Sequence, residues 1–359
     1  MTDSTNVNTA TANHESEPQP SGIEASTIHV THRHDASLIT RIFHKLIRPF
    51  GHKLASSKKV LPAGSPQLSP PSGMKKIADV HERKVDGIWI YDLRLKTAPP
   101  VHTEKHRPPH HRIYYFAGGG WQMPPSPSHW KFLSAMLKSL PDTTTITVIS
   151  YPLAPNSPAP IAIPQLLDLY NTLLTESAAK HEIVTLAGDS AGGNIVLCLP
   201  LEALRHNPNA PRPHSIMAIC PSANMNRNYP EAKHIEQVDP ILRIRFLEKT
   251  AREWMGAWDD SNPRVSPICA DLRLLRRAGV RVDGVTGGYD LLAYDGVQFR
   301  EKLREAGVWG EWLQWDGMMH CWPLAKSYGI FPESEEAFEW IVEVLKRRAR
   351  DGEGVVGKE

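Results

Sequence analysis

Residues suited to acyl transfer occur along the chain in the order serine, aspartate, histidine. Ser190 lies within the string GDSAG, directly after a short apolar run over 183–188 and directly before a helical pattern. A serine on such a tight strand-to-helix turn projects above the sheet, and side chains in place of the two flanking glycines would collide with the turn. This context predicts that Ser190 is a nucleophile. The alternative is a glycine-rich turn that carries an incidental serine.

A glycine triplet upstream could supply the oxyanion hole that such a serine needs. Gly118, Gly119 and Gly120 come at the end of a predicted strand over 112–118, where they let the backbone turn its N–H groups into the site. With the amide of Ala191 they would bind the oxygen that becomes negative, each donor contributing about 3–4 kcal/mol. A flexible loop is the competing interpretation. A phosphate cradle is disfavoured because no Gly-Lys-Ser/Thr follows.

The base and the acid are predicted from their positions. His320 is the only histidine after residue 235, and it lies on a loop just past a predicted strand. Asp290 follows another predicted strand, at the carboxyl end of the sheet, where sites in such folds assemble. It would hold the imidazole in one tautomer and stabilise its cation; capping of the next helix is the alternative role. Asp283 falls inside the strand, and Asp295 is expected to face solvent.

Strand and helix patterns alternate from about residue 80 onward. Strands are expected at 87–95, 112–118, 145–151, 183–188, 215–220, 281–288 and 311–316, and helices at 161–181, 293–307 and 334–349. Such alternation implies an α/β fold with a mostly parallel central sheet and helices on both faces. Residues 222–262 break the rhythm and are expected to form a helical cap insertion within a catalytic domain that spans 76–350.

The regions outside this domain differ in composition. Residues 1–35 are rich in Ser, Thr, Asn, Glu and Pro and are expected to be disordered, as are residues 351–359. Residues 36–75 are expected to form an amphipathic cap segment and a linker. Within them, 37–54 has apolar side chains at helical spacing and basic side chains on the other side. This pattern predicts a helix docked on the catalytic domain or, less favoured, a helix in peripheral contact with a membrane.

Composition excludes several classes of function. The net charge of +2 over 359 residues is nearly balanced, so no nucleic-acid partner is indicated. The four cysteines are far apart and form no CxxC pair, which argues against a disulfide scaffold and a zinc site, and no motif indicates another cofactor. Neither a secretory signal nor an apolar run of about 20 residues is present, so a cytoplasmic location is expected.

Taken together, these segments resemble the hormone-sensitive-lipase-like family of α/β-hydrolases. The resemblance covers about residues 110–345, and its motifs occur in the family's order: GGG at 118–120, YPLAP at 151–155, GDSAGGN at 188–194, NPRVSP at 262–267, GYD at 288–290 and GMMH at 317–320. The family usually has a histidine before the glycine triplet, and here Ala117 replaces it. The AGGGW form resembles a fungal offshoot, some members of which act on natural products.

The resemblance implies a Ser-His-Asp triad that cleaves carboxylic esters through an acyl-enzyme, as a carboxylesterase or deacetylase. Trp121 and Trp322 are expected to line a pocket for a small or medium apolar ester. One alternative is a biosynthetic hydrolase that uses the same triad for lactone opening, cyclisation or acyl transfer. A more remote alternative is a non-catalytic ligand-binding protein.

Overall fold

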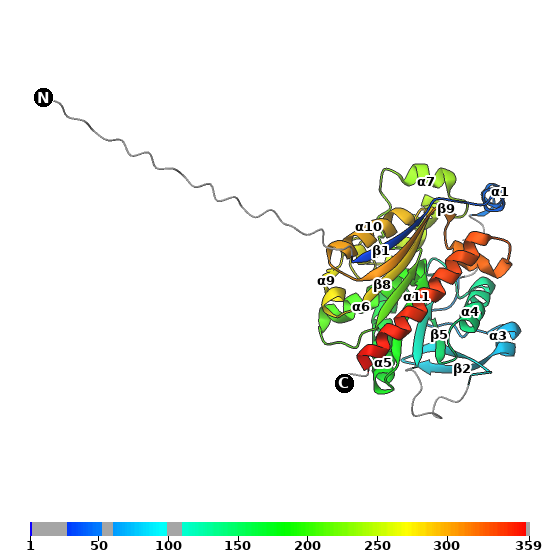
Figure 1. Ribbon diagram of the computed structural model, residues 1–359, viewed down its shortest axis with the longest axis vertical. Coiled ribbons are helices and arrows are strands. Elements are labelled where there is room, and N and C mark those ends of the chain that lie inside the picture. Colours follow the sequence, from blue (N-terminus) through cyan, green and yellow to red (C-terminus); the bar gives the residue numbers. More distant parts are fainter. Residues whose placement is uncertain (2–26, 52–59, 99–109, 357–359) are drawn as a thin grey trace.

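The computed structural model describes Met1 and residues 27–51, 60–98 and 110–356. Its sheet contains nine strands in the order β1-β9-β8-β7-β6-β4-β5-β3-β2 (Figure 1). At one edge, β3 pairs antiparallel with both β2 and β5. The other neighbouring pairs, from β5 to β1, are parallel. The bounds are β1 Ile28–Arg33, β2 Ala78–Val85, β3 Ile88–Leu95, β4 His111–Phe116, β5 Thr144–Ser150, β6 Ile183–Asp189, β7 Ser215–Ile219, β8 Arg281–Tyr289 and β9 Gly310–Met319.

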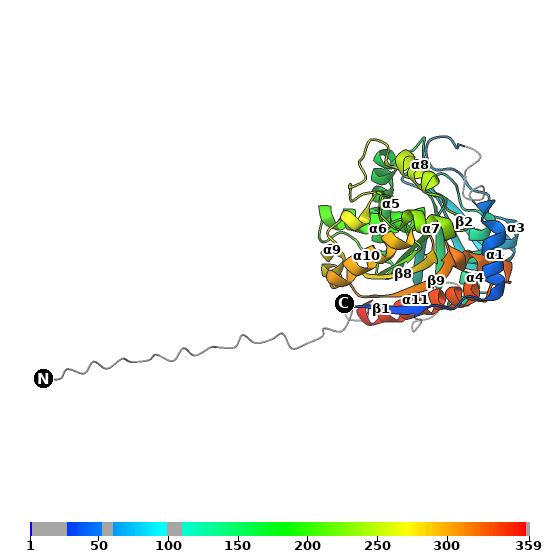
Figure 2. The ribbon, with the colours of Figure 1, turned by 90° about the horizontal axis from the view of Figure 1, so that it is seen from above.

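Helices cover both faces of the sheet. The α-helices are α1 Leu38–Ile47, α3 Ser72–Ile77, α4 Pro127–Ser139, α5 Ala159–Ala179, α6 Ala191–His206, α7 Ala232–Val238, α8 Ile244–Met255, α9 Arg273–Arg277, α10 Ala293–Glu305 and α11 Pro332–Val356, with short 3-10 helices at Pro267–Cys269 and Trp322–Tyr328. Apolar side chains of α5, α6, α9 and α10 form one core with the sheet, and those of α4 and α11 form a second core (Figure 2). The predicted α/β class with a mostly parallel sheet is confirmed.

The central strands are buried because helices cover the sheet on both faces. Every residue of β5, β6 and β7 is buried. Strands covered on both faces are expected to be continuously apolar, which is why short runs such as 183–188 can be recognised in the sequence. The six parallel strands from β4 to β9 bring their carboxyl ends to one edge, where the loops that follow them gather.

The N-terminal tail departs from the sequence prediction at one point. Residues 28–33, predicted to be disordered, form the edge strand β1, which pairs in parallel with β9. Composition misled here because an edge strand needs no apolar face: its backbone is satisfied by β9, while the guanidinium of Arg33 lies 4.3 Å from the ring centroid of Trp315. The rest of the predicted tail, residues 2–26, lies outside the described residues.

The amphipathic segment forms α1, which begins after the N-cap Ser37 and packs on the domain. The hydroxyl of Thr40 donates to Glu333 over 2.6 Å, and the ring of Phe43 lies 4.5 Å from that of Phe331. Its C-terminal end contacts the insertion, because a guanidinium N–H of Arg243 donates to the carbonyl oxygen of Arg48 over 2.8 Å. The C-terminal end of α1 therefore contacts the insertion at the segment between α7 and α8. Residues 52–54 of the predicted segment lie outside the described residues.

The last helix runs further than its sequence pattern indicated. We predicted a helix over 334–349 and a disordered tail from 351, whereas α11 reaches Val356. A buried ion pair anchors this region: the Arg348 guanidinium donates to both carboxylate oxygens of Asp283, over 2.6 and 2.8 Å. Residues 357–359 lie outside the described part.

No helix among the described residues combines the length and apolar character needed to cross a bilayer.

Candidate active site

Ser190 sits at a strained turn between β6 and α6. Its φ of 53° is in the left-handed region, which a side chain adopts at an energetic cost and only where its surroundings hold it there. The two flanking glycines are needed because the turn passes close to other backbone. A Cβ on Gly192 would lie 1.9 Å from the carbonyl oxygen of Phe116, and a Cβ on Gly188 would lie 2.6 Å from Gly192.

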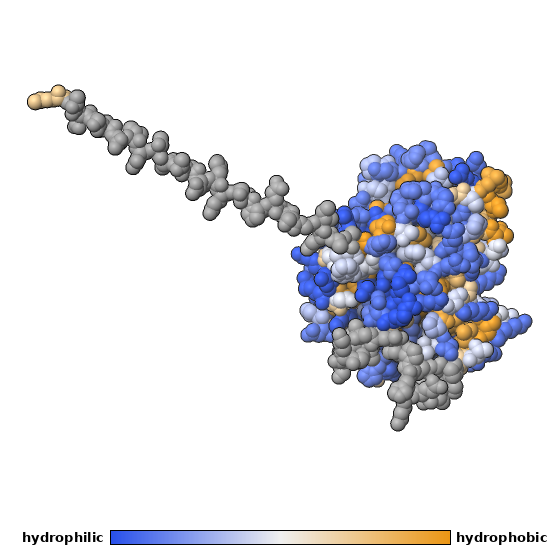
Figure 3. Space-filling view, in the orientation of Figure 1, coloured by the Kyte–Doolittle hydropathy of each residue, from blue (hydrophilic) through white to orange (hydrophobic). Residues whose placement is uncertain are grey.

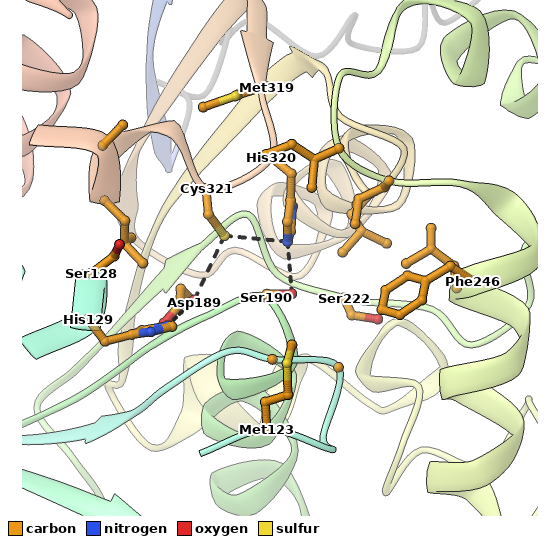
Figure 4. Close-up of a pocket in the computed structure, with 18 of the residues that line it drawn as sticks. Met123, Ser128, His129, Asp189, Ser190, Ser222, Phe246, Met319, His320 and Cys321 are labelled. Carbon is orange, nitrogen blue, oxygen red and sulfur yellow. Dashed lines mark hydrogen bonds and ion pairs between the residues drawn. The ribbon is translucent and has the colours of Figure 1, made fainter. Parts of the chain in front are cut away.

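Ser190, His320 and Asp290 form one hydrogen-bonded chain. Nε2 of His320 lies 2.9 Å from the Ser190 hydroxyl oxygen, and Nδ1 lies 2.8 Å from Oδ2 of Asp290. Asp290 follows β8 and His320 follows β9, so the parallel sheet brings both loops to the turn that carries Ser190. Figure 4 shows the imidazole pointing at the serine. The structure thus brings together the three residues that the sequence singled out.

The carboxylate of Asp290 bonds two partners, and neither bond is the predicted alternative of a helix cap, because the N-cap of α10 has no side-chain hydrogen bond. Oδ2 bonds the imidazole of His320, and Oδ1 accepts the N–H of Leu292 over 2.8 Å. The carboxylate is fully buried. The pKa of His320 is raised from its usual value: burial opposes the cation, but the charge and the hydrogen bond of Asp290 outweigh burial. A buried carboxylate that favours the imidazolium is what a general base in acyl transfer requires.

The glycine loop, residues 118–120, and the first residue of α6 provide four backbone amides, of which one is bonded to the protein and three are open. The N–H of Gly118 donates to Oδ1 of Asp189 over 3.0 Å. Within the described part of the chain, the amides of Gly119, Gly120 and Ala191 donate to no protein acceptor. Gly119 and Gly120 have φ angles of 131° and 60°, which favour glycine. Of the four predicted oxyanion donors, Gly118 is therefore committed to the protein, and the other three are available to a ligand.

A cluster around Asp189, which we did not single out from the sequence, braces this loop. Its carboxylate accepts from the Tyr115 hydroxyl over 2.7 Å and lies 3.1 Å from Nε2 of His129. Burial opposes ionisation, yet the His129 charge and these hydrogen bonds hold the pKa of Asp189 below its usual value. The Tyr151 hydroxyl donates to the carbonyl oxygen of Ala117 over 2.7 Å. These contacts hold the loop, although Ala117 replaces the histidine that the family usually has before the glycine triplet. The one sequence signal was the GDS string itself.

An apolar pocket of about 510 Å³ opens above Ser190. This volume is in the range that holds small organic ligands. The lining includes residues of α1, of α8 in the insertion and of the segment after His320, together with the loop at 119–123. The apolar lining residues include Phe43, Ile47, Phe246, Leu247, Met319 and Leu324. Residues of α1 and α8 therefore help to shape the space above the serine, as Figure 4 shows for Phe246 of α8.

The two tryptophans predicted to line the pocket have different positions. Trp121 lines it, although the side chain is mostly covered by a parallel stack on Trp254 of α8, with ring centroids 5.7 Å apart. Trp322 does not belong to the lining residues that the structure describes. Its ring is buried edge-on against Trp315, and its indole N–H donates to the carbonyl oxygen of Glu333 over 3.3 Å. Cys321, which separates His320 from Trp322 in the sequence, does line the pocket.

A buried ion pair lies beside the acid. We predicted that Asp295 would face solvent, but it is 1% exposed and bonded to the guanidinium of Arg227, which also lines the pocket. A second guanidinium N–H of Arg227 donates to the Ser222 hydroxyl over 2.5 Å. Burial raises the pKa of Asp295 to about 6, with Arg227 opposing the rise. A helical pattern cannot reveal this pairing because Arg227 comes from the insertion.

Two groups of side chains in the described part of the chain have the spacing of metal ligands. One contains Cys220, His320 and Cys321, and the other contains His32, His34 and Asp316. In each group the ligand atoms lie within 4.8 Å of one another. The first group adjoins Ser190, and the second is on the surface where β1 meets β9.

Comparison with known proteins identifies the family. Residues 113–324, more than half of the chain, match the family described as alpha/beta hydrolase fold. An esterase of Acinetobacter venetianus is 29% identical over 236 residues, which is 64% of this chain and 73% of that protein. An acetyl-hydrolase of Streptomyces hygroscopicus is 26% identical over 243 residues, which is 68% of this chain and 77% of that protein.

Hormone-sensitive lipases match over a shorter stretch. The human enzyme is 30% identical over 148 residues, which is 40% of this chain and 13% of that protein. Among solved structures, a hormone-sensitive lipase from a metagenome library has a TM-score of 0.69 at 22% identity, covering 88% of this chain and 100% of that chain. This likeness shows the shared fold. The chain therefore belongs to the α/β-hydrolase fold family, in its hormone-sensitive-lipase-like branch of esterases and lipases.

Proposed function

We propose that the protein hydrolyses carboxylic esters of small or medium apolar molecules with Ser190, His320 and Asp290 as its catalytic triad. The observation that carries the proposal is the hydrogen-bonded chain of 2.8 and 2.9 Å that ends at Ser190, beneath an apolar pocket. The similarity to an esterase and an acetyl-hydrolase supports ester cleavage and a modest acyl group.

The reaction follows from the positions of these groups. His320 takes the proton of the Ser190 hydroxyl as the oxygen attacks the ester carbonyl, and Asp290 stabilises the resulting imidazolium. The open amides of Gly119, Gly120 and Ala191 would bind the oxyanion; the first two belong to the glycine loop, and the third begins α6, whose dipole adds positive potential. The imidazolium then protonates the departing alcohol, leaving an acyl-enzyme. Water, deprotonated by the same imidazole, releases the acid.

A panel of p-nitrophenyl esters from acetyl to decanoyl tests this proposal. We expect turnover of the shorter esters and a loss of about 10⁴-fold or more in Ser190→Ala, because removing a triad nucleophile leaves only binding and oxyanion stabilisation. Ser139→Ala, which alters an exposed serine at the end of α4, is the matched control and should keep wild-type rates. A Ser190→Ala protein with undiminished turnover would disprove the triad. Absence of hydrolysis in every ester would favour the ligand-binding alternative.

We further propose that the pocket takes its substrate from an anionic lipid surface through α1. The outward face of this helix is apolar: Leu38, Ile39, Ile42 and Leu46 are 72%, 57%, 48% and 67% exposed. Figure 3 shows apolar side chains gathered over α1 at the upper right of the molecule. Burial of such side chains in a lipid interface stabilises association by about 1.5–3 kcal/mol each.

The basic residues of α1 and its position beside the pocket favour a lipid surface over a second protein as the partner of this helix. The exposed Arg41, Lys45 and Arg48 flank the apolar face, and residues 38–51 contain no acidic side chain. This combination is typical of helices that lie in the headgroup region of anionic membranes. The inner face of α1 lines the pocket, and Tyr328 and Ile330 of the pocket lining are themselves 59% and 56% exposed. A docked helix would therefore place the mouth of the pocket at the lipid surface.

Vesicle flotation tests this second proposal. The wild type should float with phosphatidylserine-containing vesicles and much less with phosphatidylcholine vesicles, and the double variant Leu38→Glu/Ile42→Glu should remain at the bottom in both. Ile161→Glu is the matched control, because Ile161 is 50% exposed on α5, away from α1. Equal flotation of the double variant and the wild type would exclude docking through α1. The same variants keep the triad, so their ester hydrolysis in solution should be unchanged.

A further inference from the structure

Two thiols lie beside the base that the proposed reaction uses. The sulfur of Cys321 is 3.5 Å from Nε2 of His320 and 3.9 Å from Oδ2 of Asp189, and Figure 4 shows it beside both side chains. The Cys220 thiol comes from the end of β7 and is buried; its sulfur, that of Cys321 and a ring nitrogen of His320 lie within 4.8 Å of one another. Neither thiol has a part in ester cleavage by Ser190.

Both cysteines have an unusual backbone conformation that fixes where their side chains lie. Cys220 has a φ of 46° and Cys321 a φ of 51°, in the left-handed region that few non-glycine residues adopt. The N–H of Cys220 donates to the carbonyl oxygen of Val285 over 2.8 Å, which holds this turn against β8. The two sulfurs are thus held near His320 by the fold.

We infer that Cys220, Cys321 and His320 form a binding site for a soft divalent metal ion such as Zn²⁺, and that the bound ion blocks hydrolysis. In tetrahedral zinc sites the metal lies about 2.3 Å from sulfur and about 2.0–2.1 Å from nitrogen, which separates the two ligand atoms by about 3.5 Å. The Cys321 sulfur and the His320 nitrogen are 3.5 Å apart. The observed spacing is therefore that of two zinc ligands.

The charge of the site also fits such an ion. A metal-bound thiol is deprotonated, so the two sulfurs would release their protons to solvent and offset the charge of a divalent ion in a buried place. The Ser190 hydroxyl, 2.9 Å from Nε2 of His320, would lose this hydrogen bond when an ion binds to that nitrogen. Cys321 lines the pocket, which gives the ion a path from solvent.

Inhibition follows from the choice of ligand atom. Nε2 of His320 is the atom that takes the serine proton in the proposed mechanism, and the same lone pair would bind the metal. Occupied by an ion, His320 cannot act as a base, and Ser190 loses its activation. This inference rests on the proposed function for the loss of activity, but the binding of the ion itself does not depend on it.

The surface group offers a competing site that the experiment must separate. Nε2 of His32 lies 3.0 Å from Oδ1 of Asp316, and Nδ1 of His34 lies 2.8 Å from Oδ2. Imidazole and carboxylate also bind zinc, but this group is exposed and carries no thiol. Because it adjoins β1 rather than the pocket, an ion there would leave the triad unobstructed.

Inhibition of ester hydrolysis gives the first test. Micromolar Zn²⁺ should abolish turnover by the wild type, and EDTA should restore it. Substitution of residues that only hydrogen-bond to a metal ligand changes metal affinity about 10–100-fold. Loss of a ligand itself in Cys220→Ser should therefore raise the inhibition constant for Zn²⁺ about 100-fold. Cys269→Ser, which alters an exposed thiol, and His32→Gln/His34→Gln should leave the constant unchanged. An unchanged constant in Cys220→Ser, or its rise in His32→Gln/His34→Gln, would overturn the inference.

Binding can be read without turnover. Cd²⁺ added to the Ser190→Ala protein should produce the ultraviolet charge-transfer band of cadmium thiolate, saturating at one equivalent. The band should be lost when the Ser190→Ala protein also carries Cys220→Ser, and likewise when it carries Cys321→Ser. Because two variants are measured, misfolding of one does not decide the result. If the band is absent from a folded Ser190→Ala protein, there is no thiolate site. If the band forms but no ester is hydrolysed by the wild type, the metal site stands and the proposed function fails.

Discussion

The backbone N–H of Gly118 donates to the carboxylate of Asp189, the residue directly before Ser190, over 3.0 Å. One hydrogen bond thus ties the glycine loop to the turn that carries the serine. Tyr115 and His129 bond the same carboxylate and hold it in place. Because the open amides of Gly119 and Gly120 follow Gly118 directly, Asp189 sets their position relative to the Ser190 hydroxyl.

Asp189→Asn should therefore slow catalysis with little effect on substrate binding. An amide in place of the carboxylate cannot accept from all three donors, and the loop should shift. Removal of one oxyanion donor costs about 10²–10³-fold in kcat, so a displaced loop should cost about tenfold or more while KM changes little. Steady-state kinetics with p-nitrophenyl acetate measure this, with Asp271→Asn, an exposed carboxyl, as the control. A kcat within twofold of the wild type would rule out the positioning role.

The pH profile should reflect the pKa of His320, which is raised to about 9. The imidazole must be neutral to accept the serine proton, so kcat/KM should rise with pH and reach half its plateau above 6.5, the ordinary value for histidine. Asp290→Asn removes the charge that favours the imidazolium and should lower this midpoint as well as the rate. Subtraction of Ser190→Ala rates corrects for alkaline hydrolysis of the ester. A wild-type midpoint at or below 6.5 would be inconsistent with the raised pKa.

Gly192→Ala should disrupt the serine turn. A Cβ there would lie 1.9 Å from the carbonyl oxygen of Phe116, so β4 and α6 would have to separate. Such overpacking costs about 1–3 kcal/mol or more of the free energy of unfolding. Gly73→Ala is the matched control in α3, where a Cβ meets nothing within 4 Å, and it should be neutral or stabilising. Thermal unfolding distinguishes them; equal melting temperatures would show that the turn accommodates the methyl group.

Arg227→Met should destabilise the fold by leaving Asp295 buried without its cation. Breaking a buried ion pair from one side costs about 3–5 kcal/mol of unfolding free energy, whereas replacing both partners with apolar residues is often neutral. The double variant Arg227→Met/Asp295→Leu should therefore recover most of the loss. Urea unfolding measures both. Similar stabilities for the single and double variants would mean that the pair contributes little at this place.

The triad could be predicted from the sequence because each member directly follows a recognisable strand. The apolar run 183–188 marks the turn at Ser190, and the parallel sheet brings the loops after β8 and β9 to the same edge. The Asp189 cluster could not be predicted, because His129 lies on α4, 60 residues away in sequence, and nothing in a helical pattern shows which side chain it will meet. Trp322 shows the same limit: proximity to His320 in sequence did not place it in the pocket.

The edge strand β1 illustrates a different limit. The strand is short, only its first residue, Ile28, is buried, and its order comes from pairing with β9, 282 residues later. Composition alone therefore predicted disorder. The contacts that join α1 to the insertion, such as Arg243 to Arg48, are equally non-local. In each case the missing information is a long-range partner, which one sequence does not contain.

Covalent labelling shows most directly whether Ser190 is the nucleophile. After incubation with an active-site-directed p-nitrophenyl phosphonate, the intact wild-type protein should gain the mass of one phosphonyl group, with loss of p-nitrophenol. Peptide analysis should place the group on Ser190, and Ser190→Ala should gain no mass. A label on another residue, such as Cys321, or equal labelling of Ser190→Ala would contradict the account.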